Sequence, residues 1–250
     1  PFLTFIALPL YENIVVSNFN IGILYILAVS SVGVIGIILA GWSSYNKWSL
    51  YGAMRAAAQI ISYEIPIALS LMLAIIIVGS LQISDIVKWQ AENRWIIIHS
   101  PFAFIAFIIY YISVVAETNR TPFDIPEAES ELVAGWMTEF SGFRWALFFL
   151  SEYANMLIVS IVASIVFLGG WLSPFQLFDI FPDSWLILDG PILGLFWLML
   201  KAVILIFIMM WFRWTFPRLR VDQLMYLCWK VFIPFALVNL FLVSLWELIF

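Results

Sequence analysis

The chain has 250 residues, of which 64% are hydrophobic and only 11% are charged, and its formal net charge at pH 7 is −5. A soluble domain of this length keeps a large wetted exterior and about a quarter of charged residues, so the composition argues against a soluble protein and favours a lipid bilayer. The negative charge argues against nucleic-acid binding, and the single cysteine, Cys228, excludes internal disulfides and cysteine-rich metal sites.

Apolar segments long enough to cross a bilayer core, about 20 helical residues each, recur along the chain. They are residues 21–41, 60–79, 96–116, 146–168, 191–212 and 229–249. Residues 1–10 resemble the end of an earlier span, and the proline-broken aromatic stretch 169–190 is predicted to lie at the outer interface. We therefore expect an all-α polytopic fold with six complete spans and one partial N-terminal span. We expect the chain to form a single integral membrane domain, residues 1–250.

Basic residues gather on one side of these predicted spans. If every span crosses, three loops share a side: residues 42–59, 117–145 and 213–228. With Lys230, that side holds eight Lys and Arg residues, whereas the opposite side holds only Lys88 and Arg94. The positive-inside rule then places the three loops in a bacterial cytoplasm or a mitochondrial matrix.

Four ionisable residues fall within or at the edge of predicted spans: Glu64, Glu117, Glu152 and Lys201. A charge at the bilayer centre costs roughly 2.5–3.5 kcal/mol, so such groups usually face the protein interior and often mark ion or proton paths. The alternative is that each lies close enough to an interface to reach water, and this alternative is strongest for Glu117. For Lys201, near the middle of its span, we expect a buried carboxylate partner.

The loop between the third and fourth complete spans, residues 117–144, is acidic although it lies on the basic side. Pro122 and Pro126 prevent a continuous helix through its first part, and a short helix is predicted from Glu127 onward. Glu127 and Glu131 would share a face of that helix and repel each other. Interleaved apolar residues such as Phe123 favour a structured, partly enclosed loop over a solvated one. Its acidic residues are Glu117, Asp124, Glu127, Glu129, Glu131 and Glu139.

The run AETNRTPFDIPEAESELVAG, residues 116–135, resembles the signature loop of the H-subunit family of proton-pumping NADH:quinone oxidoreductase, respiratory complex I. Three further segments agree in order and spacing: residues 41–64, 144–156 and 216–230. The resemblance covers nearly the whole chain. It implies a fold of eight transmembrane helices, of which the first helix, the amphipathic helix after it and part of the second are absent here.

The resemblance also implies a function: a translocase subunit that forms part of a quinone chamber and couples quinone reduction to proton pumping, with no redox centre or metal of its own. Proton coupling would fall to Glu64, Glu117, Asp124, Glu127, Glu129, Glu131, Glu152 and Lys201. The quinone chamber and its charge partners would include Arg120, Phe123, Arg144, Arg213 and Arg218. Ubiquinone or menaquinone would be the substrate.

The implied partners are the peripheral-arm iron–sulfur and quinone-site subunits and the antiporter-like and small subunits of the membrane arm. FMN and the iron–sulfur clusters would be held by partner subunits. We expect a bacterial plasma (inner) membrane, with the mitochondrial inner membrane as the alternative.

Two other functions remain open. The homologous subunit of a membrane-bound hydrogenase or ferredoxin-linked complex shares the acidic loop, although the intact loop sequence favours the quinone enzyme. A free-standing secondary transporter would show inverted repeats, and the sequence has none. A bis-histidine haem anchor is excluded because His99 is the only histidine.

Overall fold

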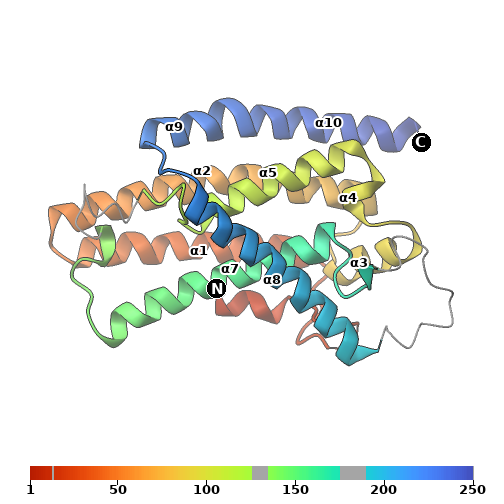
Figure 1. The fold of residues 1–250 in the computed structure, drawn as a ribbon, viewed down its shortest axis with the longest axis horizontal. Coiled ribbons are helices and arrows are strands. Elements are labelled where there is room, and N and C mark those ends of the chain that lie inside the picture. The colour runs from red at the N-terminus through yellow and green to blue at the C-terminus, as the bar shows by residue number, and fades with distance from the viewer. Residues whose placement is uncertain (13, 126–134, 175–189, 250) are drawn as a thin grey trace.

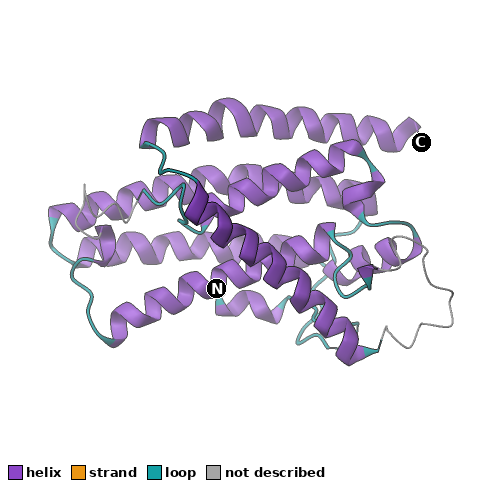
Figure 2. Cartoon of the chain, viewed as in Figure 1, coloured by secondary structure: helices purple, strands orange, loops and turns teal. Residues whose placement is uncertain are grey.

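The computed structural model describes residues 1–12, 14–125, 135–174 and 190–249, and helices make up its fold (Figures 1 and 2). In chain order they are η1 (Phe2–Ile6), α1 (Gly22–Ser43), α2 (Lys47–Val78), α3 (Ile83–Glu92), α4 (Ile96–His99), α5 (Pro101–Glu117), η2 (Gly135–Met137), α7 (Phe143–Phe167), α8 (Pro191–Thr215), α9 (Val221–Tyr226), the π-helical turn η5 (Leu227–Phe232) and α10 (Ile233–Ile249). This confirms the predicted all-α class.

Within the described residues, five helical stretches are long and apolar enough to cross a membrane: α1, α2, α7, α8 and the continuous run Val221–Ile249. The expected span at 96–116 is only partly matched: the helix there, α5, has 17 residues and is shorter than the other five stretches. The Ser100 side chain accepts a hydrogen bond from the backbone N–H of Ala103, and Pro101 occupies the first helical position. These are strong helix-start signals, so α5 begins after the short α4 and not at residue 96. Six full spans are thus not established, and the partial N-terminal span stays a prediction.

Helix α2 is the central packing element. It contacts α1, α5, α7 and α10, and η2 packs against its N-terminal half. Small residues allow these close approaches, as is common between membrane helices. A Cβ at Gly52 would lie 2.7 Å from the Cα of Gly135, and one at Gly41 would overlap the Cβ of Ala53. Helix α8 crosses α7 obliquely, and α10 lies at the edge of the bundle beside α2 and α5 (Figure 1).

The bundle buries a continuous apolar core that includes Tyr63, Leu71, Tyr110 and Phe167. Large apolar side chains also cover the outer faces of the long helices, for example Phe207 and Trp211 on α8. An apolar exterior of this kind suits contact with lipid chains. Cys228 is buried in η5, where its thiol donates a hydrogen bond to the Ser62 carbonyl over 3.0 Å.

Candidate functional site

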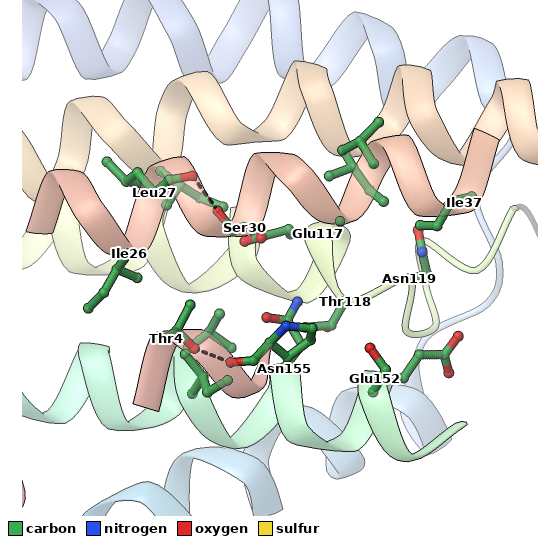
Figure 3. A pocket seen from close by; sticks show the side chains of 18 of the residues that line it. Thr4, Ile26, Leu27, Ser30, Ile37, Glu117, Thr118, Asn119, Glu152 and Asn155 are labelled. Atoms are coloured by element: carbon green, nitrogen blue, oxygen red, sulfur yellow. Dashed lines mark hydrogen bonds between the residues drawn. The ribbon is translucent and has the colours of Figure 1, made fainter. Parts of the chain in front are cut away.

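A cavity of about 300 Å³ lies among η1, α1, α2, α5 and α7 (Figure 3). Much of its lining is apolar, including Ile26, Leu71 and Val162. Thr4 and Ser30 lie at one part of the lining, and the other polar residues gather where the C-terminal end of α5 faces the N-terminal half of α7. The gathered residues are Glu117, Thr118, Asn119, Ser151, Glu152 and Asn155. The cavity is therefore amphipathic, and its polar part carries two carboxyl groups.

Glu117 is the last residue of α5, and it is only 8% exposed. Its carboxyl group interacts with the Asn155 side chain of α7, and it lies close enough to Glu64 for the two charges to repel. On α2, Glu64 accepts a hydrogen bond from the Ser31 hydroxyl of α1. Glu117 is therefore enclosed within the bundle and does not lie on its outer surface. A buried carboxyl faces the cavity and interacts with a second one outside its lining.

Arg120 forms the other charged centre of the site, just after the end of α5. Its Nη2 lies 3.7 Å from the Glu152 Oε2, and its Cζ lies 4.6 Å from the centroid of the Tyr153 ring. The side chains of Arg120 and Glu152 are 8% and 15% exposed. Within the described part of the chain, Nε and Nη2 of Arg120 have no hydrogen-bond partner. The pair is thus an enclosed ion pair, and two guanidinium nitrogens are unused by hydrogen bonds from the described residues.

The first part of the acidic loop, residues 118–125, is anchored from two sides. Gln59 of α2 donates from Nε2 to the carbonyls of Ala116 and Phe123, both over 2.8 Å. On the other side, Arg218 pairs with Asp124 over 2.9 Å. The Leu219 N–H also donates to the Pro122 carbonyl over 3.0 Å. These contacts join the loop to the connection between α8 and α9.

Several residues expected at the site lie elsewhere. The Phe123 ring packs in the core, 5.8 Å from the Tyr63 ring. Arg144 is exposed and borders a separate open hollow of about 610 Å³ with Glu139. Arg213 is exposed in the last turn of α8. Glu127, Glu129 and Glu131, and most of the stretch 169–190, lie outside the described residues.

Lys201 corrects one expectation. Its ammonium group donates to three backbone carbonyls and, among the described residues, forms no ion pair with a carboxylate. The expected buried carboxylate partner is therefore wrong for the part of the chain that the structure covers. Every residue carries a carbonyl, so no pattern of residue types pointed to these partners.

Several polar residues of the site were not predicted, among them Asn155, Ser31 and Gln59. Each is a neutral polar side chain within a long helix, and each binds a carboxyl group or a loop carbonyl. Asn155 follows Glu152 by three positions in a largely apolar helix, so the two share a face. That spacing was the available signal.

Comparison with known proteins decides the family. A family model described as NADH dehydrogenase matches residues 1–244. The chain belongs to this family. It is 48% identical over 249 residues to the H subunit of the NADH-quinone oxidoreductase of Chlorobaculum tepidum, covering 98% of this chain and 69% of that protein. The corresponding H subunit of Bacteroides thetaiotaomicron is 49% identical over 245 residues, with 97% and 67% covered. The resemblance to the H-subunit family is thereby confirmed.

Proposed function

We propose that this chain is the H-type membrane subunit of an NADH-quinone oxidoreductase and that its polar cavity couples quinone reduction to proton movement. Its family and the names of its relatives support the first part. The quinone would be its substrate, and flavin and iron–sulfur clusters would belong to partner subunits. Apolar helices and bacterial relatives support a bacterial plasma membrane. We propose that the chain forms one membrane domain there.

The buried carboxyl of Glu117 within the cavity carries the second part of the proposal. A carboxyl group enclosed beside another carboxyl cannot easily hold a full charge, because burial and like charge both favour the neutral form. The two carboxyl groups repel each other, so a change of charge at one changes the electrostatic field at the other. Proton transfer by Glu117 is therefore sensitive to the charge of its surroundings.

The ion pair of Arg120 with Glu152 would supply that change of charge. At 3.7 Å the pair is looser than a hydrogen bond, so a proton arriving at Glu152 need not break a short contact. Such a proton would remove the anion that faces Arg120 and would alter the field at the cavity. Quinone reduction consumes protons, so reduction near residues 118–125 would draw them from these carboxyls. Family resemblance extends the same role to Glu127, Glu129 and Glu131.

The test uses the whole complex in membrane vesicles that carry Glu117→Gln or Glu152→Gln. We expect proton pumping and NADH oxidation by quinone to fall by about 100-fold or more, because one positioned proton-transfer group typically contributes about 10²- to 10⁴-fold. NADH oxidation by an artificial acceptor, which draws electrons from the partner subunits, should stay unchanged. Glu92→Gln is the matched control, because Glu92 is exposed at the end of α3, on the side of the bundle opposite the loop.

Unchanged pumping in both cavity variants would refute the coupling role. Glu129→Gln and Glu131→Gln belong in the same series and test the loop directly. Purification of the tagged chain should also recover a large complex with flavin and iron–sulfur subunits. Recovery of the chain alone from gently solubilised membranes would contradict the assignment as a subunit.

A further inference from the structure

Lys201 lies in α8, ten residues beyond Pro191 and therefore roughly 15 Å along the helix axis. Its Nζ donates to the carbonyls of Leu168, Gly170 and Leu172 over 2.7, 2.9 and 2.7 Å. An ammonium group has three donors and no acceptor, so all three N–H groups are used. These carbonyls belong to every second residue of a single turn that directly follows α7.

That turn begins where α7 leaves its last carbonyls without helical partners. Leu168 is the C-cap residue of α7, and its N–H still donates to the Ser164 carbonyl over 3.1 Å. The Gly170 N–H shares that acceptor over 2.8 Å. The C-terminal end of a helix carries partial negative charge, and a cation there is stabilising. Lys201 therefore supplies both the missing donors and the favourable charge.

Trp95 closes the remaining side of the ammonium group. Its ring centroid lies 4.2 Å from the Lys201 Nζ, within the range of a cation–π contact. The turn is shaped for this approach, because Gly169 and Gly170 have φ values of +77° and +55°. A Cβ at Gly169 would lie 2.5 Å from the Trp95 Nε1. Glycine is thus required where the carbonyls converge.

We propose that Lys201 is a positioning residue: its ammonium group caps α7 and fixes that helix to α8 and to the segment before α4. This role differs from that of a proton carrier. A carrier must release its proton, and a neutral amine would point a lone pair at a carbonyl and leave one oxygen without a donor. Because α7 also carries Glu152 and Asn155, the cap holds in place the wall of the cavity. The proposal rests on the proposed function only in its activity readout.

The experiment measures amide hydrogen exchange of residues 164–172 in the whole solubilised complex, together with proton pumping and its pH profile. Lys201→Met keeps the length of the side chain and removes its charge and donors. We expect amide exchange in residues 164–172 to rise at least tenfold, because local opening sets exchange rates. We also expect proton pumping to fall while the shape of the pH profile of pumping is retained. Lys88→Met is the matched control, because Lys88 is exposed on α3, and it should leave both unchanged.

Trp95→Leu is a milder variant for the case that Lys201→Met fails to assemble. It keeps the ammonium and the three carbonyls and removes only the aromatic contact, so we expect roughly a threefold rise in exchange. Exchange within twofold of the wild type in the assembled Lys201→Met complex, or in Trp95→Leu when the first does not assemble, would overturn the proposal. Failure of the Glu117 and Glu152 variants to affect pumping would sink the coupling role but leave this exchange result standing.

Discussion

Replacing Gln59 by leucine should loosen the start of the acidic loop without removing any charged group. Gln59 is buried at 2% exposure, and its side-chain amide joins α2 to the Ala116 and Phe123 carbonyls. The leucine variant keeps a side chain of similar size and deletes both donors. The change therefore acts on the position of the loop and of Glu117, which follows Ala116.

The free-energy cost of the substitution depends on the hydrogen bonds that the two carbonyl oxygens still accept in the variant. The Asn119 N–H also donates to the Ala116 carbonyl over 3.2 Å, and the Ile125 N–H donates to the Phe123 carbonyl over 3.0 Å. Neither oxygen is left bare, so the full cost of an unpartnered buried carbonyl does not apply. Two ordinary hydrogen bonds of about 0.5–1.5 kcal/mol each are lost, or about 1–3 kcal/mol in all. The population of the undocked loop should rise by roughly 5- to 150-fold.

Hydrogen exchange of residues 118–125 in the assembled complex measures that population directly, and quinone-dependent NADH oxidation measures its consequence. Gln90→Leu is a close control. Gln90 is equally buried and donates to the Ile165 carbonyl over 2.9 Å, but it lies in α3, away from the loop. Both variants should lower the heat stability of the complex, and only Gln59→Leu should speed exchange in the loop. Equal exchange of residues 118–125 in wild type and Gln59→Leu would refute the reasoning.

Two further predictions concern the surroundings of the loop. Gly52→Ala should lower the yield of assembled complex several-fold, measured by native gel. The new Cβ would meet the backbone of Gly135 and Trp136 at 2.7–2.8 Å, and backbone atoms cannot move aside at low energetic cost. Gly33→Ala is its control, because nothing lies within 4 Å of a Cβ there, and equal yields of the two variants would contradict the packing argument. The pair of Arg218 with Asp124 is partly exposed, at 38% and 20%, so a double-mutant cycle of Arg218→Gln and Asp124→Asn on heat stability should give a coupling below about 1 kcal/mol. A coupling of several kcal/mol would show that the pair is more enclosed than the structure has it.

Much of the fold was predictable because a bilayer imposes simple rules. Long apolar runs must become helices, since no water in the membrane can satisfy exposed backbone groups. The expected spans therefore fall on α1, α2, α7, α8 and the run ending in α10. Boundaries were less predictable. Apolar content continues through residues 96–100, whereas the start of α5 depends on the Ser100 cap and Pro101.

The site was predictable only in part. An ionisable residue in an apolar segment is conspicuous in the sequence, so Glu64, Glu117 and Lys201 could be singled out without the structure. Their partners were not, because a partner is fixed by helix packing and not by distance along the chain. Ser31 and Glu64 are 33 positions apart, and Gln59 reaches a carbonyl 64 positions away.

The sequence by itself determined the membrane class, most of the helical segments, the family and the acidic character of the loop. These properties depend on the number and order of residue types in each local segment, because local apolar content decides whether a segment is stable in the bilayer. Only the tertiary structure decided that Glu117 is enclosed beside Asn155 and that Arg120 faces Glu152. It also decided that Lys201 binds the end of α7 instead of a carboxylate. Each of these contacts requires two or more helices to be placed side by side, and the energy of a buried charge depends on what that placement brings within hydrogen-bond reach.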